Sequence, residues 1–199
     1  MEEAFQSDYK KRGIRWAGSV SLPELPKDAV ILETGCGNGK TLSALGSFQA
    51  VGVDISSEAV RLAGAKTAVA GDIRALPFRD AAFDAVFCWH VLGHLTDADR
   101  RRAASELFRV TKSGGTIFFK AFSTADFRCG KGTEVEPQTY LRGDGMLTHY
   151  FTEEEVRELF GEGEISENRW SMRVKGENLQ RAEVIGVFHL PERIPKTTN

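Results

Sequence analysis

The stretch Val30-Ile-Leu-Glu-Thr-Gly-Cys-Gly-Asn-Gly-Lys-Thr41 decides the fold. An apolar run ends at Glu33, glycines then alternate with other residues from Gly35 to Gly39, and a helical pattern follows. A strand that enters glycines at the start of a helix brings backbone N–H groups close to a ligand. The stretch therefore predicts a ligand-binding loop between a strand and a helix.

Spacing separates the ligand classes that use such loops. A dinucleotide-binding G-x-G-x-x-G motif needs glycine at position 40, where this chain has Lys40. A Walker A phosphate loop matches Gly39-Lys40-Thr41 but needs glycine in place of Thr34. The pattern that fits is E-x-G-x-G-x-G, which begins at Glu33. An NTPase stays an alternative, which thermal stabilisation by ATP would identify.

Short apolar runs alternate with helical patterns along the chain, as is typical of βα units on a parallel sheet. We expect strands at 29–33, 50–54, 67–71, 83–89 and 116–122, and helices at 39–45, 56–63, 96–112 and 152–160. A capping box from Thr96 to Asp99 is expected to begin the third helix. Two further strands, at 168–174 and 182–190, suit an antiparallel pair.

These elements predict an α/β fold. It is a Rossmann-like, doubly wound, mostly parallel sheet of about seven strands with an antiparallel C-terminal strand. Residues 124–150 show no clean period and contain several glycines. Long loops in compact domains are often functional, so we expect this segment to be an insertion over the site.

The composition bounds the class of protein. The 199 residues are 41% hydrophobic and 27% charged, which argues against a disordered or fibrous chain. The length favours one domain. With 26 basic and 28 acidic residues, the net charge is −2. This overall charge gives no sign of binding to DNA, RNA or an anionic membrane.

The cysteines and the N-terminus predict the compartment. Cys36, Cys88 and Cys129 are too far apart for a disulfide framework or a CxxC metal site. We therefore expect no metal and a reducing, cytoplasmic compartment. Neither a signal-peptide core nor a run of about 18 apolar residues occurs, so no membrane partner is expected.

Further motifs follow the glycine loop in order. Asp54 closes the second strand about 20 residues later, where a carboxylate can accept both hydroxyls of a ribose. Gly71-Asp72-Ile73 follows the third strand, and Val86-Phe-Cys-Trp-His90 ends the fourth. Together with E-x-G-x-G-x-G, these motifs resemble the class I S-adenosylmethionine-dependent methyltransferases over residues 28–123.

The resemblance implies S-adenosylmethionine as cofactor. The residues it implies as binding the cofactor are Arg15, Glu33, Gly35, Cys36, Gly37, Asp54, Ile55, Asp72, Ile73, Cys88 and Trp89. Asp72 would meet the adenine amino group, Trp89 would border the methionine side, and Arg15 would pair with the cofactor carboxylate. Seen alone, the glycines could be turn formers and Asp54 a helix cap. Because the motifs occur together and in this order, they favour binding of the cofactor over these local roles.

Methyl transfer from a sulfonium needs alignment and exclusion of water more than an acid–base pair. A hydroxyl or amine acceptor would require a base, for which His90, His94 and His149 are candidates, whereas an ionised carboxylate would need none. Each histidine also has a packing role as its alternative, and for His149 this is an aromatic hinge. No catalytic residue is assigned.

We expect 1–199 to be a single methyltransferase domain. It comprises an N-terminal lid segment (1–27), a cofactor-binding core (28–123), an insertion over the acceptor side (124–150), and a C-terminal helix and strand pair (151–199).

A small-molecule acceptor is expected, because the near-zero net charge argues against a large polyanion. A narrower resemblance keeps tRNA as the second acceptor. Arg12-Gly-Ile-Arg-Trp16, Leu76-Pro-Phe-Arg-Asp80 and Asp99-Arg-Arg-Arg102 are similar to segments of the tRNA wobble-uridine carboxymethyl methyltransferases. A cofactor-binding protein without catalysis, with 124–150 as a partner interface, is a further alternative.

Overall fold

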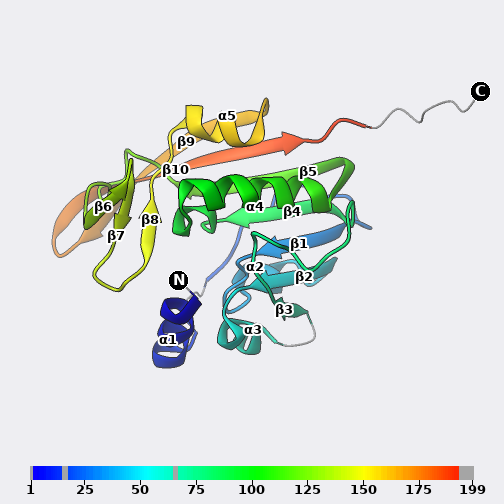
Figure 1. Ribbon diagram of the computed structural model, residues 1–199, viewed down its shortest axis with the longest axis horizontal. Coiled ribbons are helices and arrows are strands. Elements are labelled where there is room, and N and C mark those ends of the chain that lie inside the picture. Colours follow the sequence, from blue (N-terminus) through cyan, green and yellow to red (C-terminus); the bar gives the residue numbers. More distant parts are fainter. Residues whose placement is uncertain (1, 15–17, 65–66, 193–199) are drawn as a thin grey trace, which may run out of the picture.

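A computed structural model describes residues 2–14, 18–64 and 67–192 of the chain. Arg15 and Trp16 therefore lie outside the described residues. The centre is a seven-stranded sheet in the order β3-β2-β1-β4-β5-β10-β9 (Figure 1). Its strands are β1 (Val30–Thr34), β2 (Gln49–Asp54), β3 (Ala68–Ala70), β4 (Phe83–Trp89), β5 (Thr111–Phe122), β9 (Glu164–Val174) and β10 (Glu177–His189).

The pairing of the strands confirms the predicted fold. β1 to β5 run parallel, while β10 is antiparallel to both β5 and β9. Going along the chain, the sheet grows from β1 through β2 to β3 and then restarts on the other side of β1 with β4. This reversal leaves a crevice at the carboxyl ends of β1 and β4, where open α/β sheets bind their ligands.

Two clusters of buried apolar side chains lie on opposite faces of the central strands. Leu32 of β1 packs in a cluster with side chains from the C-terminal helices, whereas its neighbour Ile31 packs in a second cluster on the opposite face. Successive strand residues point to opposite faces, so a strand that is covered on both sides must be apolar throughout. This is why 30–32 of β1 and 85–89 of β4 are continuous apolar runs in the sequence.

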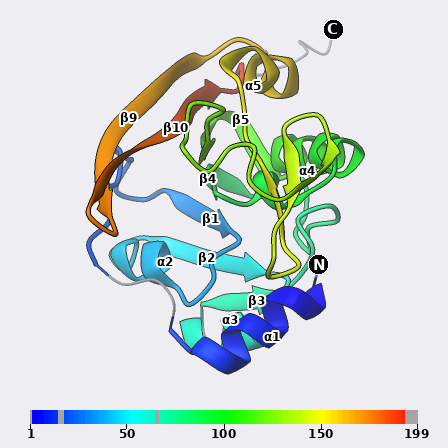
Figure 2. The ribbon, with the colours of Figure 1, turned by 90° about the vertical axis from the view of Figure 1, so that its left-hand side faces the viewer.

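Helices cover the sheet, and Figure 2 shows α1 lying alongside α3. The helices are α1 (Glu2–Arg12), α2 (Lys40–Ala44), α3 (Ser57–Ala63), α4 (Asp97–Val110) and α5 (Glu153–Phe160), with a 3₁₀ turn η1 (Leu92–His94). The side chains of Ser56 and Thr152 cap α3 and α5 by accepting hydrogen bonds from backbone N–H groups. Among the described residues, no helix combines the length and apolarity that a membrane crossing requires.

The start of α4 corrects one prediction. Thr96 holds the N-cap position, but its side chain makes no capping hydrogen bond, so the predicted capping box was wrong. The backbone N–H of Asp97 instead donates to Glu136 at 3.0 Å, and Asp99 pairs with Arg74 at 2.8 Å. Glu136, which is distant in sequence, therefore accepts one N–H group of this helix end, and a local motif does not reveal such a partner.

The segment 124–150 is not the long loop that the sequence predicts. It contains β6 (Thr133–Glu136), β7 (Thr139–Leu141) and β8 (Leu147–His149), which form a separate antiparallel sheet (Figure 1). Strands of three or four residues are too short to show a period of two. We call these three strands the roof sheet.

Candidate active site

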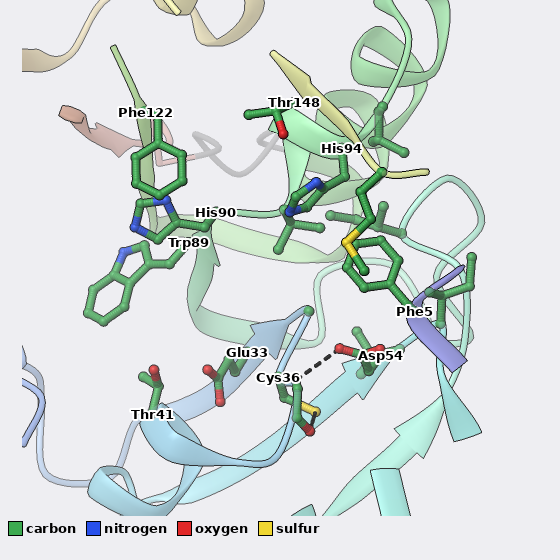
Figure 3. A pocket seen from close by; sticks show the side chains of 18 of the residues that line it. Phe5, Glu33, Cys36, Thr41, Asp54, Trp89, His90, His94, Phe122 and Thr148 are labelled. Atoms are coloured by element: carbon green, nitrogen blue, oxygen red, sulfur yellow. Dashed lines mark hydrogen bonds between the residues drawn. The ribbon is translucent and has the colours of Figure 1, made fainter. Parts of the chain in front are cut away.

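A cavity of about 570 Å³ opens at the carboxyl ends of β1, β2 and β4, within the range typical of small-ligand sites. One part of its wall comes from the glycine loop and the ends of β1 and β2, and we call this part the cofactor end. Opposite lie residues of β5, β10 and the segment 124–150, which we call the acceptor end. Figure 3 shows Glu33 and Asp54 across the cavity from His90 and Phe122.

The glycine loop comes close to the segment after β4. Gly35 has a φ of 62°, and a Cβ built on it would lie 2.3 Å from Cγ2 of Val91. Only glycine fits this backbone and this approach. The backbone N–H of Cys36 donates to the carbonyl of Val53 at 3.1 Å, which ties the loop to β2. Gly35, Cys36 and Gly37 all line the cavity.

Asp54 lies at the last position of β2 and is buried, with its residue 9% exposed. Its Oδ2 accepts a hydrogen bond from the N–H of Gly37, and its Oδ1 accepts one from Ser56, both at 2.9 Å. Burial raises the pKa of the carboxyl, against the lowering effect of these two bonds. Each carboxylate oxygen has a second acceptor site, so Asp54 can still receive hydroxyl donors from a ligand.

Glu33 is more deeply buried, with 6% of the residue exposed. Burial raises the pKa of its carboxyl to about 7, although the hydroxyl of Thr41 and the backbone of Leu42 donate to it. Among the described residues, its Oε2 is buried without a hydrogen-bond partner. A buried carboxyl that faces a cavity and has an oxygen without a hydrogen-bond partner is complementary to a cationic ligand group.

Asp72 and Ile73 line the cavity beyond the end of β3. Both oxygens of Asp72 accept hydrogen bonds from Arg74, which also reaches Asp99 at 2.8 Å. The side-chain bond from Arg74 lowers the pKa of Asp72. Arg74 itself lines the cavity, although no motif in the sequence pointed to it.

Two residues at the end of β4 were predicted to bind the cofactor, and they differ in position. Trp89 lines the cavity. Cys88 does not; it is fully buried in the core, where burial raises the pKa of its thiol to about 12. Arg15, which was also predicted to bind the cofactor, lies outside the described residues.

The three candidate histidines separate into two groups. His90 and His94 line the cavity, whereas His149 does not. His149 is 2% exposed, and its two ring nitrogens lie 2.8 Å from Thr139 Oγ1 and 2.7 Å from Glu155 Oε2. These contacts make His149 a structural residue that joins β8 of the roof sheet to α5.

The two cavity histidines are held differently. His90 has a φ of 59°, and its Nε2 lies 3.1 Å from Oε1 of Glu183. His94 Nδ1 lies 2.7 Å from the carbonyl oxygen of Leu147. A carbonyl only accepts, so Nδ1 of His94 carries a proton and, in the neutral ring, the lone pair is on Nε2.

Residues 32–119 match a family described as "Methyltransferase domain". The chain carries a class I S-adenosylmethionine-dependent methyltransferase domain. A "tRNA (carboxymethyluridine(34)-5-O)-methyltransferase" of Arabidopsis thaliana is 37% identical over 105 residues, which are 51% of this chain and 26% of that protein. A "Malonyl-[acyl-carrier protein] O-methyltransferase" of Erwinia billingiae (strain Eb661) is 38% identical over 100 residues, 47% of this chain and 39% of that protein.

The solved structures agree on the fold. A methyltransferase from Methanosarcina mazei superposes with a TM-score of 0.68 at 24% identity, covering 85% of this chain and 95% of that chain. The chain spans about a quarter of the length of the Arabidopsis relative. These comparisons show a methyltransferase domain, whose family implies S-adenosylmethionine as the methyl donor, while the acceptor is not determined by them.

Several residues of the methyltransferase cavity were not found from the sequence. Phe5 and Tyr9 come from α1, Phe122 from β5, and Arg181 and Glu183 from β10. Arg181 and Glu183 are two apart on one strand, which places them on the same face. That spacing was visible in the sequence, but the strand's neighbour was not: Glu183 pairs in register with Phe122 only because β10 lies against β5.

Proposed function

We propose that this chain transfers a methyl group from S-adenosylmethionine to a small molecule that binds at the acceptor end of the cavity. The observation that carries the proposal is that α1 and the segment around β8 of this chain both contribute to the wall of the cavity. Phe5 and Tyr9 come from α1, while Met146 directly precedes β8 and Thr148 lies in its middle. A wall built in this way suits a small acceptor, because water must be excluded from the reacting atoms.

The residues of the cofactor end fit S-adenosylmethionine. Asp54 would accept the ribose hydroxyls, and Ile73 would offer backbone beside the adenine with Asp72 at its amino group. Glu33, a buried carboxyl with an unpartnered oxygen among the described residues, would face the cationic methionine part. Gly35 and Gly37 would let the backbone approach closely. The pairing of Arg15 with the cofactor carboxylate stays a prediction.

The chain would act mainly by positioning. Bound at this end, S-adenosylmethionine would supply a methyl group on a sulfonium centre whose sulfur leaves as a neutral thioether. The residues therefore need to hold the accepting atom in line and to keep water out. No side chain has to stabilise a developing charge on the leaving group. His90 and His94 would serve as walls that orient the acceptor.

One observation favours tRNA as a second candidate acceptor. Two relatives that are 37% identical over 105 and 97 residues are named as tRNA carboxymethyluridine methyltransferases. They share only about half of this chain, and the chain spans 26% and 15% of their lengths. A likeness of that extent is compatible with a shared donor and a different acceptor.

A paired labelling experiment tests the acceptor. The chain is incubated with S-adenosylmethionine carrying a labelled methyl group, once with bulk tRNA and once with a small-molecule extract. We expect label in small molecules and none in tRNA; label in tRNA would overturn the small-molecule proposal. Calorimetric binding of S-adenosylmethionine without label in either pool would instead identify a binding protein. The Asp54→Asn variant serves as the control for cofactor-dependent labelling.

A further inference from the structure

We propose that the acceptor carries an anionic group, of the size of a carboxylate, that binds to Arg142 together with Arg128 and Arg181 at the acceptor end. This inference rests on the proposed function, since it names the class of acceptor for the same cavity. All three arginines line that cavity. They come from separate parts of the chain, the segment 124–150 and β10, and converge only in the folded structure.

A buried carboxylate fixes two of the three arginines. Asp126 has a fully buried side chain, and it pairs with Nε of Arg128 at 2.8 Å and with Nε of Arg181 at 2.7 Å. Its oxygens also accept backbone N–H groups of Arg128 and Ala182. Despite burial, the hydrogen bonds from Arg128 and Arg181 hold the pKa of Asp126 down at about 2. Asp126 is not among the cavity-lining residues, so it orients the arginines from behind.

Aromatic contacts fix the same two arginines further. The guanidinium carbon of Arg128 lies 3.9 Å from the centre of the Phe122 ring, and that of Arg181 lies 5.0 Å from it. Cation–π contacts of this kind hold a guanidinium in place without consuming its N–H donors. Each guanidinium has five such donors, so both arginines keep donors for a ligand.

Arg142 is the arginine that lacks a carboxylate. Its Nη1 donates to the hydroxyl of Tyr150 at 3.1 Å and to the carbonyl of Arg128 at 3.4 Å. Within the described part of the chain, Arg142 forms no ion pair. The guanidinium is half-buried and bound only to neutral groups, so its positive charge has no negative partner. An anionic ligand would supply that partner.

The charges around the cavity support the same assignment. The acidic residues that line the acceptor end are Asp144, which is exposed to solvent, and Glu183, which pairs with His90. The side chains of Arg128 and Arg181 are 25% and 12% exposed, so water screens their charge less than that of Asp144. Asp126 and Glu183 are both engaged by partners, so Arg142 is the cation at the acceptor end that an anionic group of the acceptor would pair with.

Calorimetry with a simple probe tests this assignment. The chain is saturated with S-adenosylhomocysteine and titrated with benzoate, an aromatic carboxylate, and with benzamide, its neutral analogue. We expect benzoate to bind at least about tenfold tighter than benzamide. Arg142→Gln should weaken benzoate binding about tenfold and leave benzamide binding unchanged, while Arg142→Lys, which keeps the charge without the fork, should lie between.

The control is Arg157→Gln, an exposed arginine on α5 that does not line the cavity, and it should bind both probes like the parent chain. Equal binding of benzoate and benzamide, absence of benzoate binding, or an equal loss in Arg157→Gln would overturn the proposal. The melting temperature and the affinity for S-adenosylhomocysteine show whether each variant folds. Failure to bind S-adenosylhomocysteine would count against the proposed function instead, so the two failures are distinguishable.

Discussion

The carboxylate of Asp54 accepts the backbone N–H of Gly37 at 2.9 Å, and this bond ties the end of β2 to the glycine loop. The same carboxylate accepts the N–H of Ser56, whose side chain caps α3. Asp54 thus holds together the three segments that surround the cofactor end. Its position would allow one acidic residue to serve both the architecture of the loop and the proposed binding of a ribose.

Asp54→Asn should weaken binding of S-adenosylmethionine by about 10–100-fold, because a charged acceptor of two hydroxyls becomes a neutral amide. Isothermal calorimetry measures the affinity. Asp80→Asn is the matched control, since the side chain of Asp80 is 80% exposed and lies outside the cavity lining. An unchanged affinity in Asp54→Asn would remove Asp54 from the cofactor site.

Glu33→Gln should stabilise the chain without cofactor at pH 8 by up to about 3 kcal/mol and change little at pH 4.5. The folded-state pKa of about 7 exceeds the ordinary value of 4.5, so the free energy of unfolding falls as the pH rises from 4.5 to 7. Glutamine cannot ionise and avoids this loss. Denaturant unfolding at both pH values measures the effect; parallel pH profiles of the variant and the parent would contradict it.

The same substitution should weaken binding of S-adenosylmethionine about tenfold at pH 7.5 and much less at pH 5.5, where Glu33 is protonated in the parent chain. Binding a cation beside Glu33 favours its ionised form, so the affinity of the parent should rise with pH through about 7. Calorimetry at three pH values follows this. A pH-independent difference between variant and parent would place the cation elsewhere.

Gln6→Ala should speed dissociation of S-adenosylmethionine about fivefold, with little change in melting temperature. Gln6 Oε1 accepts the hydroxyl of Ser56 at 2.8 Å and the N–H of Glu58 at 3.2 Å, and so fastens α1 to α3. Since Phe5 of α1 lines the cavity, a loosened α1 opens that wall. Stopped-flow fluorescence measures the rate, with Glu3→Gln, an exposed change on the same helix, as control.

Arg100→Met should destabilise the chain by about 2–4 kcal/mol and loosen the roof sheet. The Arg100 side chain is 3% exposed and lies 3.5 Å from Glu155 and 3.9 Å from Glu136, so it joins α4 to α5 and β6. The neighbouring change Arg101→Met is the control, because that side chain is 57% exposed and should cost little. Thermal unfolding and hydrogen exchange over 133–149 test this; equal effects of the two changes would contradict it.

His94→Asn should lower kcat less than tenfold, whereas loss of a general base typically costs 10²–10⁴-fold, an order-of-magnitude range. The asparagine amide can replace the Nδ1 donor to the carbonyl of Leu147, so the contact with the start of the roof strand β8 is kept. The measurement is the rate of methyl transfer to the acceptor found by labelling. A loss of 10³-fold or more would make His94 a base, contrary to catalysis by positioning.

The central strands and the cofactor end could be predicted because their signals are local. β1 and β4 are buried on both faces and appear as largely apolar runs, while Gly35 directly follows β1 and Asp54 ends β2. Strand limits were less predictable. β5 begins at Thr111 rather than at residue 116, because it pairs with β4 through an irregularity near Phe83 that no local pattern reveals.

The acceptor end could not be predicted as a unit. Arg128 and Arg142 lie in the segment 124–150, which shows no clean period, and no local pattern connects them with Arg181. His149 had the features of a catalytic residue in the sequence, but the fold buries it between Thr139 and Glu155. Burial and partners that lie far along the chain decide the role of such residues.

The sequence alone thus determined the parallel sheet, the glycine loop and the carboxylates beside it, since each depends on residues close together in the chain. Only the tertiary structure decided which side chains face the acceptor. β10 lies against β5, and the roof sheet folds back over the strand ends, so that Arg142 and Arg181 line one cavity although about 40 residues of chain separate them. Contacts of that range depend on the packing of whole elements, which no local spacing records.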